Sequence, residues 1–260
     1  MSILKTEALV LKTWRFGETS KILSLFTKDY GKIKVIAKGA LAPKSPFKGC
    51  LETLSHLRIV FYEKKTRELQ LLSQADLLDG HIHILGNFMR TTLALSATEL
   101  VDKAILPEEP LPLVFTLLVE YLRAMNTGKG FLEAYFWFFE THFIEIMGYR
   151  PTWERCLECQ GFLGSEGGFF QPENGGLLCY SCGVKRGGLR IEGETVEILY
   201  WLQKAKWEEV GLVKPDLRQK AEIRKMFDIY FKTHIEHLRG LKALEFFYGM
   251  EAKEGELSET

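Results

Sequence analysis

The 260-residue sequence has no excess of charge of either sign, because 34 lysine and arginine residues balance 34 aspartate and glutamate residues. A neutral total argues against a nucleic-acid partner only if the charges are evenly spread, which the total cannot show. Apolar residues make up 46% and charged residues 26% of the chain, a globular composition that excludes collagen-like, mucin-like and wholly disordered proteins. The length is that of two domains, or of one domain with a small insert.

Long apolar runs are also missing. Residues 1–12 carry two lysines and have neither an apolar core nor a small-residue cleavage site, so they lack the features of a secretory signal. The most apolar stretch, residues 130–148, contains three glutamates and a histidine and falls short of a membrane span. We therefore expect a cytoplasmic protein with no membrane contact.

The motifs of common active sites are absent. The sequence has no G-x-x-x-x-G-K-[ST] phosphate-binding loop, no G-x-S-x-G nucleophile turn and no H-E-x-x-H metal site. Its six histidines and its carboxylates do not cluster as they do in a metal nuclease. We therefore predict that the protein is not an enzyme and has no small-molecule substrate.

Cysteine is scarce, but four of the five cysteines form two close pairs, Cys156-x-x-Cys159 and Cys179-x-x-Cys182, with 19 residues between the pairs. Disulfides do not persist in a reducing compartment, and this spacing is typical of zinc sites. Two tight turns supply four thiolates, which saturate a tetrahedral ion and leave no position for water. The spacing predicts one structural Zn²⁺; redox dithiols and a chance arrangement are the alternatives. The fifth, Cys50, is predicted to be a buried thiol.

Glycines around the cysteine pairs favour tight turns and a small hairpin. Gly161 and Gly183 follow the second cysteine of each pair, where a positive φ would let backbone N–H groups point at sulfur. Two glycine pairs, at 167–168 and 175–176, bracket two phenylalanines and indicate a short hairpin between the metal-binding turns.

Residues 1–78 have a β pattern, with five short apolar-rich runs separated by turn signals. The runs cover residues 3–16, 21–28, 32–39, 54–62 and 68–76. Five strands with a longer connection between the third and the fourth predict a small closed barrel such as an OB-fold. An SH3-like barrel is the alternative that strand counting leaves open.

From residue 79 the apolar period becomes helical. Helical patterns cover residues 82–105, 111–126, 131–147, 194–210, 216–238 and 241–249. We predict an α+β protein in which an N-terminal five-stranded β-barrel at 1–78 precedes an all-helical domain at 79–250. A four-cysteine zinc element at about 153–190 is inserted in the helical domain, and residues 251–260 form a flexible acidic tail.

The aromatic-rich run at 131–143 is apolar on most sides of a helix. A helix of this kind usually lies at the centre of a bundle. A groove for a hydrophobic peptide of a partner is the alternative.

The neutral total hides an uneven distribution of charge. Residues 1–75 have a net charge of +8, residues 76–150 of −5, residues 151–190 of zero and residues 191–260 of −3. A basic barrel is therefore joined to an acidic helical body.

The strongest local signal is the segment 32–38, in which lysines alternate with apolar residues. On a strand Lys32, Lys34 and Lys38 share one face, and the other face is formed by Ile33, Val35 and Ala37. OB-folds bind nucleic acid across their second and third strands and the adjacent loops. Solubility of an exposed strand is the alternative role for any single lysine.

Seven cations are predicted to contact nucleic acid: Arg15, Lys21, Lys32, Lys34, Lys38, Lys44 and Lys48. Each phosphate that they neutralise would release counterions and make binding dependent on salt. Three aromatic residues of the barrel, Trp14, Phe16 and Tyr62, could stack on bases.

Short segments in a fixed order resemble the RecO family of bacterial DNA repair and recombination mediators over nearly the whole chain. They are Gly17-Glu18-Thr19-Ser20 before Leu25-Phe26-Thr27 and Gly31; Val35-Ile36-Ala37-Lys38-Gly39-Ala40 with Ser45; and Cys156-x-x-Cys159 with Gly175-Gly176-Leu177-Leu178-Cys179-x-x-Cys182. Two positions depart from the family pattern: Leu41 stands where an arginine is usual, and Ala243 where a serine is common.

The resemblance implies an N-terminal OB-fold, a helical domain and a four-cysteine zinc element. It implies a non-enzymatic protein that binds single- and double-stranded DNA, anneals complementary strands and, with RecR, helps to load RecA onto DNA coated by single-strand binding protein (SSB). RecF and RecA would be involved indirectly, contact with SSB would be through its C-terminal tail, and the location would be cytoplasmic and nucleoid-associated. An RNA-binding or transcription-linked OB plus zinc-ribbon module and a protein-interaction scaffold are the alternative functions.

Overall fold

The computed structural model describes residues 2–64, 66–163, 165–236 and 238–249. The chain divides into two compact units, Met1–Asn126 and Thr127–Thr260. The expected tail at 251–260 lies outside the described residues. Among the helices described, none has both the length and the apolar character that a membrane span requires.

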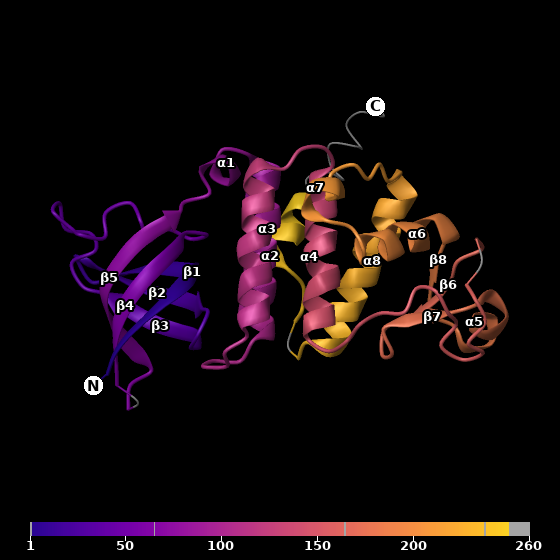
Figure 1. The fold of residues 1–260 in the computed structure, drawn as a ribbon, viewed down its shortest axis with the longest axis horizontal. Coiled ribbons are helices and arrows are strands. Elements are labelled where there is room, and N and C mark those ends of the chain that lie inside the picture. Colours follow the sequence, from indigo (N-terminus) through magenta and orange to yellow (C-terminus); the bar gives the residue numbers. More distant parts are fainter. Residues whose placement is uncertain (1, 65, 164, 237, 250–260) are drawn as a thin grey trace. The chain divides into compact units, whose positions relative to one another are not determined.

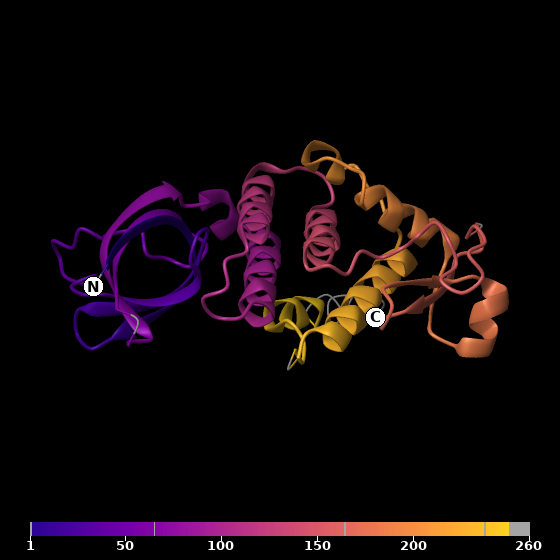
Figure 2. The same ribbon diagram turned by 60° about the horizontal axis from the view of Figure 1, so that its bottom comes forward.

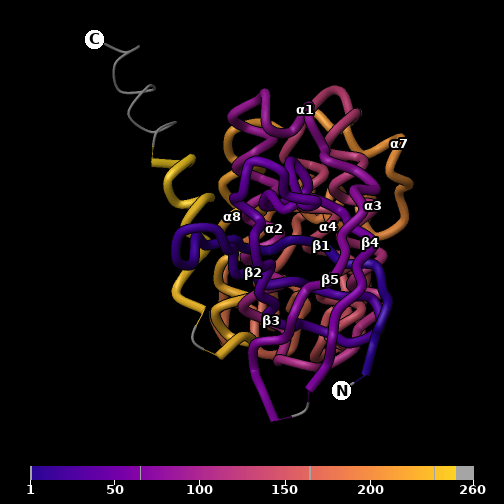
Figure 3. Tube along the Cα trace, turned by 90° about the vertical axis from the view of Figure 1, so that its left-hand side faces the viewer, coloured from indigo at the N-terminus to yellow at the C-terminus, as the bar shows by residue number. Residues whose placement is uncertain are grey.

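The first unit begins with a closed five-stranded barrel in the order β1-β2-β3-β5-β4 (Figure 3). Neighbouring strands are antiparallel except β3 and β5, which are parallel. This order with one parallel pair fits an OB-fold and excludes the SH3-like alternative. All five predicted strands are present: β1 (Ser2–Phe16), β2 (Ser20–Thr27), β3 (Gly31–Ala37), β4 (His56–Glu63) and β5 (Leu69–Asp79).

Side chains that alternate along the strands fill the interior of the barrel. In β3, Ile33, Val35 and Ala37 are buried in the barrel core, whereas Lys34 is exposed. The predicted apolar face of β3 is therefore confirmed, whereas the opposite face combines the exposed Lys34 with the half-buried Ile36, and Lys38 lies in the turn after the strand. Cys50 belongs to the same core and is 6% exposed, as predicted.

Three helices follow the barrel in the first unit (Figure 1): α1 (Ile82–Leu85), α2 (Phe88–Ala104) and α3 (Pro112–Thr127). The single helix predicted at 82–105 is two helices, because the Asn87 side chain caps α2 by accepting a 3.0 Å hydrogen bond from the Arg90 N–H. The Phe115 ring of α3 packs 5.7 Å from Phe26 and 5.9 Å from His56, so helices cover part of the outer surface of the barrel.

Gly31 shows how closely the chain packs there. Its φ is +65°, and a Cβ at this position would lie 2.4 Å from the backbone oxygen of Glu109. The segment that follows α2 therefore passes directly against the start of β3, and only glycine fits this approach.

The second unit is built around α4 (Leu132–Ile146), which buries eleven of its fifteen residues. This confirms the prediction that the aromatic run forms a central helix. The pattern at 194–210 is two helices, because the chain turns between residues 203 and 206. The other elements are α6 (Gly193–Leu202), α7 (Trp207–Val210), α8 (Leu217–His234) and a helical stretch at 242–249.

The cysteine region forms a small three-stranded sheet with one helix, which lie together in the second unit (Figure 2). The strand order is β7-β6-β8, and β6 and β7 form the predicted hairpin. The elements are β6 (Gly168–Gln171), β7 (Gly176–Leu178), α5 (Tyr180–Arg186) and β8 (Leu189–Ile191).

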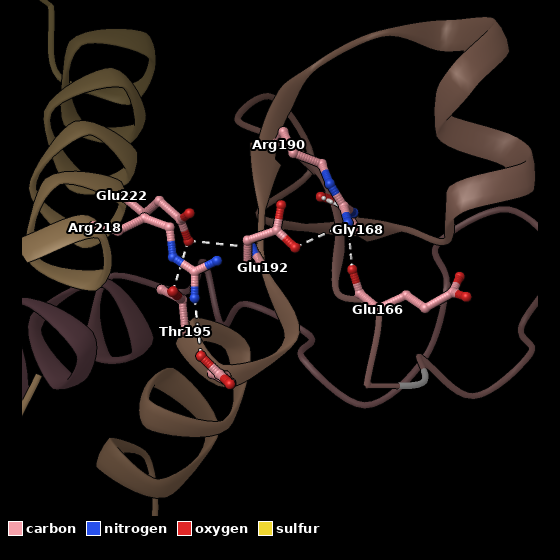
Figure 4. A network of polar contacts seen from close by, with 8 residues as sticks. Glu166, Gly168, Arg190, Glu192, Thr195, Arg218 and Glu222 are labelled. Carbon is pink, nitrogen blue, oxygen red and sulfur yellow. Dashed lines mark hydrogen bonds and ion pairs between the residues drawn. The ribbon is translucent and has the colours of Figure 1, made fainter. Parts of the chain in front are cut away.

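Polar contacts tie this sheet to the helices beside it (Figure 4). The Arg190 guanidinium donates to the Gly168 carbonyl at 3.4 Å and pairs with Glu192 at 3.2 Å. Glu222 of α8 accepts from the Glu192 backbone N–H at 3.1 Å and from the Thr195 hydroxyl at 2.6 Å. The end of β8 and the start of α6 are thereby fixed to α8.

Candidate metal centre and nucleic-acid interface

Four cysteines converge at the sheet in the second unit. The sulfur atoms of Cys156, Cys159, Cys179 and Cys182 all lie within 4.8 Å of one another, so this group could hold a metal ion. The Cys159 and Cys179 sulfurs are 3.8 Å apart. Zinc–sulfur bonds of about 2.3 Å at tetrahedral angles place two sulfurs about 3.8 Å apart, so the spacing is that of a tetrahedral thiolate site.

A tight turn presents the first cysteine pair. The Cys156 N–H donates to the Gly161 carbonyl at 2.9 Å, and the Gln160 N–H donates to the Cys156 carbonyl at 3.0 Å. The positive φ that closes the turn, +59°, belongs to Gln160, so its expected place at Gly161 is wrong. The residue directly after the second cysteine reverses the chain here.

Gly183 also has a different role from the expected one. It lies inside α5 and does not have a positive φ. A Cβ at this position would meet the Phe169 ring at 2.2 Å. Glycine is needed because α5 packs directly on β6, which places Cys182 beside the other three sulfurs.

Hydrogen bonds favour a thiolate in this cluster. Burial raises the pKa of Cys156, but hydrogen bonds from the backbone of Cys179, Cys159 and Glu158 outweigh it and lower the pKa to about 6. The hydrogen bond with Cys179 raises the pKa of Cys182 to about 12. The lowered pKa of Cys156 favours its thiolate, which is the form of cysteine that binds metals.

The strand register places an apolar row on the outer surface of the barrel in the first unit. Trp14 lies opposite Ile22, Ile22 opposite Ile36 and Ile36 opposite Leu71. Residues opposite one another on neighbouring strands share a face, so these four side chains follow one another across four strands. Tyr62, opposite Leu71, continues the row around the barrel. We call these five residues the outer apolar row.

Two exposed aromatic rings lie at the end of β1. Trp14 is 46% exposed and Phe16 is 52% exposed. Arg15, between them in sequence, is exposed and donates to the Glu18 carbonyl at 3.4 Å. This end of β1 therefore offers two rings for stacking and a cation beside them.

Exposed cations accompany the outer apolar row. Lys34 lies opposite Ser24 on β2, in the row next to Ile36, and is exposed. Four further predicted cations are exposed as well: Arg15, Lys38, Lys44 and Lys48. Their ammonium and guanidinium groups can meet phosphates from the solvent side.

Two of the seven predicted cations are held by carboxylates of the chain. Lys32 lies 3.4 Å from the Asp102 carboxylate, donates to the Asp102 carbonyl and has a side chain that is 17% exposed. Lys21 lies 2.8 Å from Glu52 and has a side chain that is 16% exposed. Sequence reasoning missed both acidic partners, because Asp102 is 70 and Glu52 is 31 positions away from its lysine.

The loop after β3 frames a hollow at one end of the barrel. Its volume is about 260 Å³, and Lys21, Leu41, Lys48 and Glu52 contribute to its lining. Leu41, at which the sequence resemblance leads us to expect an arginine, is 39% exposed. Of the two lysines that line this hollow, Lys48 is exposed and Lys21 is half-buried.

Two family models match the chain. The model described as "Recombination protein O N terminal" matches residues 1–81, which contain the barrel. The model described as "Recombination protein O C terminal" matches residues 85–245, which contain the helices and the cysteine element.

Curated relatives match most of the chain. A protein of Pelotomaculum thermopropionicum is 32% identical over 95% of this chain and 94% of its own length. A protein of Chloroherpeton thalassium is 27% identical over 94% of this chain and 98% of its own length. One of Salinibacter ruber is 34% identical over 64% of each chain. Each of the three is named "DNA repair protein RecO".

Proposed function

Because the chain belongs to the RecO family, we propose that it is a non-enzymatic DNA-binding protein of DNA repair and recombination. It binds single- and double-stranded DNA through the outer surface of the barrel in its first unit. The observation that carries this proposal is the combination of exposed cations with exposed aromatic rings on that surface.

The two kinds of residue have different parts in binding. Lys34, Lys38, Lys44, Lys48 and Arg15 neutralise phosphates of either form of DNA, and the counterions that they release drive binding. Bases of an unpaired strand can also stack on aromatic side chains, which contributes about 1–3 kcal/mol per base. Lys21 and Lys32 contribute less, because an acid of the chain already holds each of them.

Annealing and mediation follow from such a surface. A protein that binds two complementary strands through their phosphates lowers the repulsion between them and leaves the strands free to pair. We propose that the chain anneals complementary strands and, with RecR, helps to load RecA onto SSB-coated DNA in the cytoplasm. In this role the chain makes and breaks no covalent bond.

We propose that the four cysteines hold one structural Zn²⁺. The sulfur spacing supports this assignment, as does the donor set of four thiolates, which leaves no coordination position for a substrate. Cys156, Cys159, Cys179 and Cys182 would be its ligands, and the ion would fix the turns on both sides of β6.

Fluorescence anisotropy of a labelled oligonucleotide over a salt series tests the DNA-binding surface. The double variant Lys34→Glu with Lys38→Glu should weaken binding of single- and double-stranded DNA at least about tenfold and reduce the salt slope by about 2. The matched control, Lys185→Glu with Lys214→Glu, changes the total charge equally at two exposed lysines of the second unit. Equal loss of binding in both double variants would show that net charge, and not the barrel surface, governs binding.

Two further measurements address the mediator role. Complementary labelled strands should anneal faster in the presence of the wild-type protein, and the Lys34 and Lys38 double variant should lose this effect. An RNA strand of the same sequence serves as a competitor; preference for RNA over DNA would favour the RNA-binding alternative. Intact DNA binding without faster annealing would refute the annealing function.

A further inference from the structure

A cavity of about 550 Å³ lies in the second unit, between α4, α8 and the segment 238–248. Its walls include aromatic rings from all three: Phe136 and Trp137 of α4, Phe227 and Phe231 of α8, and Tyr248. Lys225, Asp228 and Lys232 of α8 also line it and are exposed, so they mark its mouth. A cavity of this size, apolar inside and polar at the mouth, has the dimensions of a site for a small organic group.

One buried carboxyl in the lining of this cavity has no hydrogen-bond or ion-pair partner among the described residues. Glu140 of α4 is 3% exposed, and among the described residues nothing donates a hydrogen bond to it or forms an ion pair with it. Burial, and after it the charges of Glu133 and Asp228, raises the pKa of Glu140 well above its usual range. A buried polar group without a partner is rare in folded proteins and marks a place where something else can bind.

Two of the cations that line the cavity, Arg224 and Lys232, are paired with acids of the chain. Arg224 binds Glu133 through two hydrogen bonds, of 2.9 and 2.7 Å, and lies 3.9 Å from the centre of the Tyr248 ring. Lys232 forms a 2.8 Å ion pair with Asp228. The Tyr248 hydroxyl donates to Glu133 at 3.1 Å. These contacts pair Glu133 and Asp228 with cations, whereas Glu140 is the buried acid in the lining of the cavity.

We propose that this cavity binds an organic cation with an apolar stem, a primary amine or a guanidinium, and that Glu140 is its counter-ion. The aromatic walls suit the stem, and their ring faces attract a cation. An anionic group would meet Glu140, with Glu133 and Glu245 close by, and a plain hydrocarbon would leave the carboxyl unpaired. Two sources present this chemistry: a free alkylamine, and a lysine or arginine side chain of a bound protein segment.

Binding of the cation should be coupled to proton release. The raised pKa of Glu140 favours its neutral carboxyl in the empty cavity, whereas the amine arrives as an ammonium ion. Where Glu140 carries a proton, that proton passes to solvent when the ammonium reaches the carboxyl, and a carboxylate–ammonium pair remains. A cation next to a carboxyl stabilises the ionised form of the acid, so the loss of the proton and the binding of the cation are coupled.

Calorimetry on the full chain tests this proposal with three probes that share the same phenylbutyl stem and differ only in the end group. They are 4-phenylbutylamine, 4-phenylbutanol and 4-phenylbutanoate. The amine should bind at least about tenfold more tightly than the alcohol, and the carboxylate should bind more weakly than either. Titration of the amine in two buffers of different ionisation enthalpy should reveal a release of protons on binding. Equal affinity of the three probes, or a preference for the carboxylate, would overturn the proposal without the need for any variant.

A matched pair of variants identifies the counter-ion. Glu140→Gln keeps the size of the side chain and should reduce amine affinity to that of the alcohol, with no proton release. Glu197→Gln, at an exposed position of α6 away from the cavity, should leave the preference unchanged. Full amine affinity in a folded Glu140→Gln protein would show that Glu140 is not the counter-ion.

A peptide comparison separates the two sources of the cation. The peptide acetyl-Ala-Phe-Lys-Ala-amide is compared with the same peptide carrying Gln for Lys. Tighter binding of the lysine peptide than of 4-phenylbutylamine, lost in Glu140→Gln, assigns the cavity to a protein segment. Tighter binding of the amine assigns it to a small molecule.

Discussion

The barrel and the cysteine element are both small β structures, yet their strands differ in length and in what they enclose. β1 has 15 residues and the barrel closes on itself, whereas β7 and β8 have three residues each. Leu25, Val35 and Ile59 are fully buried inside the barrel. A closed barrel can bury enough apolar area to fold on packing alone, whereas three short strands depend on an additional constraint such as a metal.

The two regions also use their polar side chains differently. Around the cysteine element, arginines pair with acids of the same region, such as Arg186 with Glu158 at 3.2 Å and Arg190 with Glu192 at 3.2 Å. On the barrel, Lys21 and Lys32 also pair with acids, but Lys34 and Lys38 of the predicted basic segment remain exposed. These two lysines are the cations of the segment that a partner can reach without displacing an acid among the described residues.

The largest effect expected is that of removing the metal. A chelator, or Cys156→Ser, should remove an apparent stabilisation of about 10–16 kcal/mol from the cysteine element and unfold it. Zinc content should fall from about one per chain to none, and amide hydrogen exchange should become fast over β6, β7 and α5 while β1–β5 stay protected. Cys50→Ser, the control in the barrel core, should retain the metal. Slow exchange at β6 after complete metal removal would contradict this contrast between the regions.

The converse change should affect only the barrel. Leu25→Ala deletes a fully buried side chain of β2 and should reduce the free energy of unfolding by about 2–5 kcal/mol, measured by denaturant titration. Metal content should remain unchanged. Leu212→Ala, at a side chain that is 72% exposed, is the control and should cost less than about 0.5 kcal/mol. A loss of metal from Leu25→Ala would show that the two regions do not stabilise themselves separately.

The outer surface of the barrel should distinguish the two forms of DNA. Trp14→Ala removes a stacking ring and should weaken single-stranded DNA binding by about 1–3 kcal/mol, with a much smaller effect on duplex, whose bases are already stacked. Lys34→Gln should weaken both forms alike and reduce the salt slope by about 1. Anisotropy with matched single- and double-stranded probes measures both variants. An equal loss for the two forms in Trp14→Ala would rule out stacking as the role of that ring.

The smallest effect expected is a dependence of barrel stability on pH. His81 is fully buried and its Nδ1 lies 3.0 Å from the Leu54 carbonyl. Burial lowers the pKa of His81 below the ordinary 6.5, and the charge of Asp79 opposes this shift in part. Just below pH 6.5, His81 therefore binds a proton in the unfolded chain but stays neutral in the folded chain. Stability should be complete above pH 6.5 and should fall below it by at most about 1.4 kcal/mol per pH unit. His81→Asn, which suits the φ of 47° at this position, should flatten that dependence in urea titrations; an unchanged slope would exclude His81 as its source.

Much of the local structure could be predicted, because it depends on neighbours in sequence. Alternation in β3 separates Lys34 from Val35, and the C-x-x-C spacing brings two sulfurs to one turn. The turn residues were harder to assign: the positive φ belongs to Gln160 and not to Gly161. A left-handed residue at that point is set by the hydrogen bonds of the turn, and glycine is only the residue that adopts it most easily.

Long-range pairing could not be predicted. Nothing near Lys32 in sequence indicates Asp102, and nothing near Trp14 indicates Ile36 or Leu71. The outer apolar row exists only because closure of the barrel fixes the register of four strands at once. The cavity with Glu140 has the same origin, since α4 and α8 come from distant parts of the chain.

The sequence by itself determined the order of the barrel and the helices, the four cysteines that could hold a metal ion and the basic character of the barrel that a net charge of zero conceals. Each of these follows from residue type and short spacing, which act through local geometry. Tertiary structure alone decided which cations stay exposed, which apolar side chains line up across the barrel and which buried acid faces a cavity. Those properties depend on distances between residues far apart in the chain, and only the packed fold sets such distances.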